Sequence, residues 1–327
     1  MIHRLEETAE MIRSGTPLLI SGSAEMMSRL PKGNWIGGTT PYLLTDKGGI
    51  STKDYLLVTP LPAQARMICI QRYGVGGLHL LPQDVPGNGF SVVIMPAGTM
   101  VHQNFAKEAP SYPGIYTKAL TGWVCGPSGG RFGGRPQVFY GPAAHPIEDE
   151  AVAIHMELPD DEVASVEIIN VYEPGTGPSI KFPGDGFTTT HAIIDGQTVL
   201  FSEYIDKRKE DVGLPLVANY CGTLINVGIL HYDMATAQVT FYGPVFRNVE
   251  YRFAKPMDDM KERIRAAMPK DGTVPVFNCI CVSNYTNGGL EDFDPGAFSG
   301  PIAFGEIAHQ VVNQTITYMR ILKKPTI

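Results

Sequence analysis

Apolar and polar positions alternate along this chain in two ways, which predict both helices and strands. Residues 2–13, IHRLEETAEMIR, carry apolar side chains at helical spacing and end before a Ser-Gly pair, so they predict an opening helix. Residues 151–158, AVAIHMEL, alternate apolar and polar positions, which is typical of a strand with one solvated face. His155 lies on the polar side of this pattern and is therefore predicted to be a surface residue.

Further strands and helices are predicted in both halves of the chain. Short apolar runs such as FSVVIM, TLINVGIL, PVFNCICVS and TITYMRIL predict strands, and MDDMKERIRAAM predicts a helix. Residues 172–187 are dense in proline and glycine, which interrupt regular structure. The pattern predicts an α/β fold of mixed α+β layers, with two lobes of mixed sheets covered by helices. The expected lobes are residues 1–185 and 186–327.

Length and charge narrow the class of protein. A chain of 327 residues has room for two cores. Its net charge of −7 and the lack of a lysine or arginine cluster disfavour nucleic acid as a partner. The sequence has neither a signal-peptide pattern nor a long apolar run, so we expect a cytoplasmic protein with no membrane partner. Charged residues make up only 18% of the chain, which favours an extensive interior or a homo-oligomer.

The five cysteines match no disulfide or metal pattern. Their number is odd and most lie beside strand-like apolar residues, so a disulfide framework is not expected. Cys279 and Cys281 have C-x-C spacing without a second pair, so no metal site is assigned. The chain has no C-x-x-C-H motif for covalent haem, and the identity of any cofactor stays unknown. If a cysteine acts as a nucleophile, the candidates are Cys281 and Cys221.

The closing segment, residues 299–321, places polar residues inside a predicted buried strand. Gly305 and Glu306 are surrounded by apolar residues, and a buried carboxylate needs a partner. Two interpretations are open: Glu306 binds a ligand in a cleft between the lobes, or it accepts hydrogen bonds from the backbone of a neighbouring loop. Asn313 and Thr315 add amide and hydroxyl groups, which can bind a polar small molecule or satisfy a loop.

A second polar group ends a predicted strand near the N-terminus. Gly38, Thr39 and Thr40 belong to the stretch GGTT, where glycine permits a ligand to approach the backbone closely. Pro41 follows, and neither a lysine nor a helix start has the spacing of a phosphate-binding loop. We expect this stretch and the closing segment to face one shared cleft between the lobes.

Several stretches resemble, in order, the FIST family, a sensory domain named for F-box and intracellular signal transduction proteins. They are PLLISGSAEMMSRLPKGNWIGGTTPYL, HAIIDGQTVLFSEYIDKRKEDVGLPLV, TFYGPVFRNVEYRFAKP, VFNCICVSNY and FGEIAHQVVNQT. The chain departs from the family pattern at Ser283-Asn284, where a Gly-Arg pair is expected. The resemblance implies a ligand-sensing module. Since no output domain fits within these 327 residues, a separate signalling protein is the expected partner.

Two functional hypotheses follow. The first is a stand-alone FIST-like sensor that binds a small polar metabolite. The alternative is a hydrolase or transferase of such a metabolite, with a cysteine or threonine nucleophile in the cleft. The eight histidines are scattered and no G-x-S-x-G motif occurs, which favours binding over catalysis, and no catalytic residue is assigned. The predicted ligand-binding residues are Gly38, Thr39, Thr40, Cys281, Asn284, Gly305, Glu306, Asn313 and Thr315.

Overall fold

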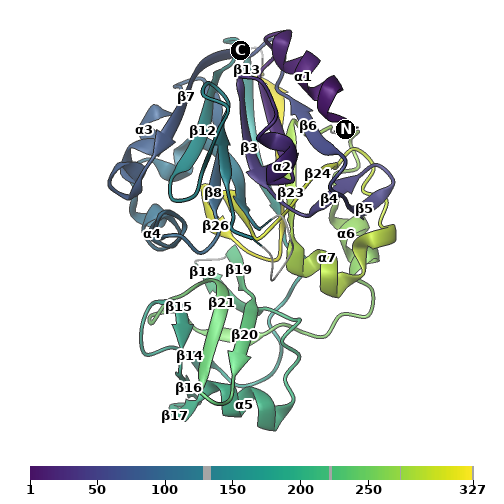
Figure 1. The fold of residues 1–327 in the computed structure, drawn as a ribbon. Helices are drawn as coiled ribbons and strands as arrows, with labels where there is room; N and C mark the ends of the chain where they lie inside the picture. Colours follow the sequence, from purple (N-terminus) through teal and green to yellow (C-terminus); the bar gives the residue numbers. More distant parts are fainter. Residues whose placement is uncertain (128–133, 221–222, 273, 326–327) are drawn as a thin grey trace.

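The computed structural model describes residues 1–127, 134–220, 223–272 and 274–325. They form a mixed α/β fold, which confirms the predicted fold class. Figure 1 shows a larger part that holds both ends of the chain and a smaller part built from its middle. The smaller part, from residue 174 to residue 254, is termed the inserted lobe, and the other described residues are termed the body. An isolated bridge between Pro174 and Ala254 closes the inserted lobe at its base.

The first sheet of the body carries the N-terminal helix. Its strand order is β1-β6-β2-β3-β10-β11, in which β2 and β3 are parallel. Helices α1 and α2 cover one face with the side chains of Ile12 and Met27. The opening helix starts later than predicted because Ile2 and His3 pair with β6. The elements are β1 (Ile2–His3), α1 (Leu5–Arg13), β2 (Leu18–Gly22), α2 (Ala24–Met27), β3 (Trp35–Thr39), β6 (Leu56–Pro60), β10 (Val138–Tyr140) and β11 (His145–Ile147).

The second sheet lies at the centre of the body, in the order β26-β25-β9-β8-β12-β7. Its strands β8 and β9 are parallel. Helices α3 and α4 cover one face, where Leu81 and Phe105 pack against Val93 and Val124. The elements are β7 (Arg66–Tyr73), α3 (Leu81–Asp84), β8 (Gly89–Pro96), α4 (Met100–Glu108), β9 (Ala119–Cys125), β12 (Ala151–Glu157), β25 (Gly305–Ala308) and β26 (Gln310–Val312).

His155 on β12 is buried, so the prediction that it lies at the surface is wrong. Its side chain is 0% exposed, because the face of the sheet that carries it is covered by other elements and is not in contact with solvent. The ring nitrogens are satisfied inside the protein: Nδ1 lies 2.6 Å from the Ser91 hydroxyl, and Nε2 lies 2.9 Å from the Tyr73 hydroxyl. The sequence pattern showed a polar residue, but it did not show that two hydroxyl groups accompany it.

The third sheet contains the last strand of the chain, in the order β13-β27-β23-β24-β4-β5. Helices α6 and α7 pack on it through Ile264 and Val282. A core that includes Ile36, Phe90 and Met319 is shared by all three sheets of the body. The elements are β4 (Tyr42–Thr45), β5 (Gly48–Ser51), β13 (Glu162–Ile169), α6 (Met260–Ala267), β23 (Phe277–Cys281), α7 (Val282–Gly288), β24 (Gly300–Ala303) and β27 (Ile316–Lys323).

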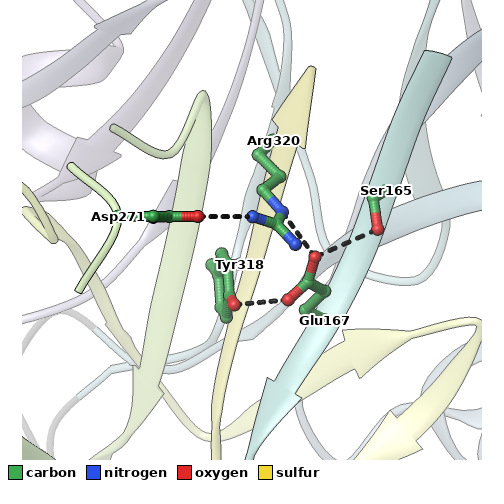
Figure 2. Close-up of polar contacts among 5 residues, drawn as sticks. All are labelled: Ser165, Glu167, Asp271, Tyr318 and Arg320. Carbon is green, nitrogen blue, oxygen red and sulfur yellow. Dashed lines mark hydrogen bonds and ion pairs between the residues drawn. The ribbon is translucent and has the colours of Figure 1, made fainter. Parts of the chain in front are cut away.

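A half-buried ion pair fastens the last strand to β13. Arg320 on β27 donates from Nε to the carboxylate of Glu167, which also accepts from the Tyr318 and Ser165 hydroxyls (Figure 2). The same guanidinium group donates to Asp271 at 3.2 Å. These contacts satisfy the carboxylate of Glu167 within the sheet, so this cluster is a structural feature.

The sheets do not separate at residue 186. Strand β25 pairs with β9, β24 pairs with β4, and β27 pairs with β13. Each of these pairs joins a strand from the second expected lobe to one from the first. The division into residues 1–185 and 186–327 therefore does not follow the sheets, whereas the inserted lobe does form sheets of its own.

The inserted lobe contains two sheets around an aromatic core. One has the order β17-β16-β14-β22-β18-β19 and the other β15-β21-β20. Phe182, Phe201 and Phe241 pack together between them, and α5 contributes Phe201. The elements are β14 (Ile180–Lys181), β15 (Gly186–Thr189), β16 (His191–Ile194), β17 (Gln197–Leu200), α5 (Phe201–Arg208), β18 (Leu216–Tyr220), β19 (Thr223–Val227), β20 (Ile229–Asp233), β21 (Gln238–Val245) and β22 (Tyr251–Phe253).

Candidate functional site

Glu306 is fully buried on β25, and its environment keeps it protonated. Its Oε1 accepts hydrogen bonds of 2.7 Å from both the backbone N–H and the hydroxyl of Thr315. Its Oε2 has no hydrogen-bond partner among the described residues. Burial raises the pKa of Glu306 to about 8, although the Thr315 hydrogen bonds act in the opposite direction. The carboxyl group is therefore mainly neutral at pH 7. The two hydrogen bonds at Oε1 agree with the interpretation in which Glu306 accepts hydrogen bonds from a neighbouring loop.

The segment that follows β26 connects the body to the inserted lobe. The Asn313 Oδ1 atom accepts a hydrogen bond from the Gly228 N–H at 2.9 Å. The Gln314 Nε2 atom donates to the Gly213 carbonyl at 3.0 Å and to the Ser283 hydroxyl at 3.2 Å. The backbone of Gln314 has a φ of 52°, in the left-handed region, so the chain turns sharply at this residue. Asn313 and Gln314 thus hold the two parts of the protein together.

The predicted residues near the end of the chain come together at this junction. The Tyr172 hydroxyl donates to Asn284 Oδ1 at 3.0 Å, and Asn313 Nδ2 lies 3.5 Å from the Cys281 sulfur. Burial raises the pKa of the Tyr172 hydroxyl, and the nearby carboxylate of Asp211 acts in the same direction. The whole set is termed the junction cluster: Tyr172, Cys281, Asn284, Glu306, Asn313, Gln314 and Thr315.

The stretch GGTT does not join the junction cluster. The Thr39 hydroxyl donates to the Gly126 carbonyl at 2.6 Å, and the Thr40 hydroxyl donates to the Ile302 carbonyl at 2.7 Å. A Cβ at Gly38 would lie within 3.0 Å of side chains of the second sheet, so glycine is needed there for packing. The hydroxyl groups of both threonines are used within the fold, and a role in ligand binding has no support from their contacts.

Gly305 also has a packing role. A Cβ at this position would lie 3.3 Å from Val124 and 3.4 Å from Val311, which is a tight contact. The residue begins β25 and pairs with Val124 on β9. Gly305 therefore helps to place Glu306 and offers no polar side chain of its own.

Cys281 is in a poor environment for a nucleophile. The thiol is fully buried, and desolvation together with the nearby Glu306 raises its pKa well above the usual range. An activated cysteine needs the opposite shift, toward the thiolate. Cys221, the other candidate, lies outside the described residues.

A cavity of about 310 Å³ lies between the body and the inserted lobe. Here α4 and β26 of the body face β19 and β21 of the lobe (Figure 1). Its walls are mainly apolar, with polar groups at a few points, as is typical of small-molecule sites. The residues that line it include Lys107, Asp185, Asn226, Gly243, Gln310 and Asn313. This space is termed the interlobe cavity.

A second cavity, of about 560 Å³, lies on the other side of the junction cluster. Tyr172 and Ser283 of the body and Asp211 and Gly213 of the lobe line it. Asn313 lines the interlobe cavity, so the junction cluster separates the two spaces. Among the predicted site residues, only Asn313 faces a described cavity directly.

His102 marks another contact between the two parts. The ring of His102 on α4 packs edge-on against Phe187 of the lobe, with centroids 5.1 Å apart. The Gly98 N–H donates to Nδ1 at 3.2 Å, which leaves the proton on Nε2. Full burial lowers the pKa of His102 to about 4, so the ring is neutral at physiological pH.

Most residues that line the interlobe cavity were not predicted from the sequence. Lys107 and Gln310 lie in the body, and Asp185 and Gly243 lie in the lobe. Lys107 and Asp185 lie in none of the stretches that resemble a known family, whereas Gly243 lies in TFYGPVFRNVEYRFAKP. The final motif, FGEIAHQVVNQT, contains both Gln310 and Asn313 and was the strongest local signal that pointed to this region.

No group of residues in the described part of the chain has the composition of a metal site. In the same part, no helix is both long enough and apolar enough to cross a membrane.

The fold and the site define an α/β protein whose inserted lobe and body enclose a cavity. The chain belongs to the Family of unknown function (DUF6976), which matches residues 3–322. Searches of curated proteins and of solved structures find no match.

Proposed function

We propose that this protein binds a small molecule in the interlobe cavity and that a separate signalling protein responds to the bound state. The observation that carries the proposal is a cavity framed by both parts of the chain and lined by Asn313, which also bonds the lobe. A ligand there contacts both parts at once. It can therefore favour one arrangement of the lobe over another, which is the physical basis of a sensor.

The sequence motifs are consistent with this role. The resemblance to the FIST family suggests a ligand-sensing module, and most of the quoted motifs contribute residues to the junction cluster or the cavity. A cytoplasmic location and a homo-oligomeric state belong to the same proposal. The buried, protonated Cys281 gives a catalytic alternative no comparable support.

Native mass spectrometry of the freshly purified full chain tests the proposal. We expect a small molecule to be retained or, in a thermal-shift screen, to stabilise the protein. A ligand at a hundred times its dissociation constant adds about 2.7 kcal/mol to the free energy of unfolding. Gly243→Leu should remove this stabilisation, because a Cβ at Gly243 meets no atom within 4 Å and the larger side chain extends into the cavity.

Gly87→Leu is the matched control, since a Cβ there also meets no atom within 4 Å and Gly87 does not line the interlobe cavity. It should bind as the wild type does. If the ligand binds Gly243→Leu with unchanged affinity while that variant stays folded, the interlobe cavity is not the site.

A further inference from the structure

The hydrogen-bonding groups that remain free in the interlobe cavity are mainly donors. Asn313 uses Oδ1 on the Gly228 N–H, and its Nδ2 has only the Cys281 sulfur at 3.5 Å. Gln310 uses Oε1 on the Tyr116 hydroxyl at 3.0 Å, which leaves Nε2. Both amides therefore offer N–H groups, whereas each amide oxygen already accepts one of the two hydrogen bonds it can take.

The charged groups at the rim act in the same direction. Within the described residues, Lys107 makes no ion pair or hydrogen bond, so its ammonium group is free. Asp185 is already engaged, because its Oδ1 accepts from the Arg247 N–H at 2.7 Å and lies 3.5 Å from Arg247 Nε. The unpaired charge at the cavity is thus positive.

The remaining polar side chains do not reverse this balance. Asn226 has both of its N–H groups engaged, since Nδ2 donates to Asn170 Oδ1 and to the Gln314 carbonyl, and its Oδ1 already accepts from Asn170. Tyr220 and Asn248 can each donate or accept a hydrogen bond, so they do not favour a donor over an acceptor on the ligand. Glu306 lies behind the wall, and burial raises its pKa, so it places little negative charge near the cavity at neutral pH.

We infer that the ligand of the interlobe cavity is an acceptor-rich molecule with an apolar body, of the class of small organic carboxylates. The apolar walls contact the body of the ligand, while Lys107, Gln310 and Asn313 donate to its oxygen atoms. This inference rests on the proposed function, because it names the ligand class of that same cavity. A charged Glu306 would instead favour a cationic or polyhydroxyl ligand.

Three probes of nearly equal shape test the ligand class: phenylacetate, 2-phenylethanol and 2-phenylethylamine. Binding to the full chain is measured by calorimetry or ligand-observed NMR at pH 7 and low salt, where charge effects are least screened. We expect phenylacetate to bind at least roughly threefold more tightly than the other two, in keeping with one partly exposed ion pair plus hydrogen bonds.

Two substitutions test which residues cause the preference for phenylacetate. Lys107→Met should weaken phenylacetate roughly three- to tenfold and 2-phenylethanol less than about twofold, because only the carboxylate loses a charge partner. Gln310→Glu keeps the shape and the acceptor for Tyr116 but replaces the free donor with an acceptor, so it should also weaken phenylacetate. Lys32→Met, at an exposed lysine away from the cavity, is the control for net charge and should change none of the affinities.

The outcomes separate the two proposals. If all three probes bind equally and Gly243→Leu abolishes all three, the cavity is a binding site but the carboxylate inference is wrong. The inference also fails if Lys107→Met and Lys32→Met have the same effect on phenylacetate. If no probe binds up to about 10 mM, the limit of weak specific binding, the carboxylate class is rejected, and a retained ligand in native mass spectrometry still decides the proposed function.

Discussion

Gly122→Ala should lower the free energy of unfolding by more than about 4 kcal/mol, the range reserved for severe core defects. Gly122 lies in the middle of β9, where it pairs with Val93 on β8 and with Ile307 on β25. A Cβ there would lie 1.8 Å from the Val93 carbonyl oxygen, and the φ of +152° already favours glycine. Backbone atoms cannot rotate away as a side chain does, so the sheet that positions Glu306 must move.

Urea unfolding followed by tryptophan fluorescence measures this effect, since Trp35 and Trp123 are both buried in the body. Gly243→Ala is the matched control, because that strand glycine has no atom within 4 Å of an added Cβ. We expect the control to stay within about 1 kcal/mol of the wild type. A Gly122→Ala protein of equal stability would mean that β8 and β9 lie farther apart than the structure places them.

The residues near the end of the chain were the most predictable part of the site. Glu306, Asn313 and Thr315 are close in sequence, and β23 delivers Cys281 to the same place. The sequence also predicted correctly that a buried carboxylate needs partners, and Thr315 supplies two hydrogen bonds. It could not show that Glu306 is protonated, because that depends on burial by distant segments.

Other parts of the site could not be predicted, because a polar residue type does not reveal its partner. Thr39 and Thr40 suggested a ligand site, yet their hydroxyl groups bond backbone carbonyls at Gly126 and Ile302. The interlobe cavity depends on where the inserted lobe sits, which is set by contacts such as that between Asn313 and Gly228. Such contacts join residues about a quarter of the chain apart and leave no periodic signal.

The stability of the protein should fall as the pH rises from about 6.5 to 8, and Glu306 should be the cause. In the folded state its pKa is about 8, whereas the ordinary value of 4.5 applies when the chain is unfolded. Between these values the folded protein retains a proton that the unfolded chain has released, so raising the pH favours unfolding. One proton is worth about 1.4 kcal/mol per pH unit, so Glu306 by itself costs about 2 kcal/mol over this range. The N-terminal ammonium group offsets part of this loss, because burial lowers its pKa from 8.0 and the folded protein releases that proton before the unfolded chain does.

Below pH 6.5 an opposing effect sets in. The pKa of His102 is lowered to about 4 from its ordinary 6.5, so the unfolded chain takes up a proton that the folded protein refuses. Its contribution to stability is lost as the pH falls from 6.5 toward 4. His155 and His309, whose pKa values burial also lowers, add to this acid-side loss. The stability of the wild type should therefore be greatest near pH 6.5.

Glu306→Gln separates the two effects, because the amide keeps an oxygen for the two Thr315 donors but cannot titrate. We expect urea unfolding of this variant to give a stability within roughly 1 to 3 kcal/mol of the wild type at pH 6, the cost of one altered buried polar group. The decline between pH 6.5 and 8 should disappear, while the decline on the acid side should persist. If the wild type and Glu306→Gln lose stability equally between pH 6.5 and 8, the carboxyl group is already ionised in the folded protein, and Oε2 must then have a partner that stabilises its charge.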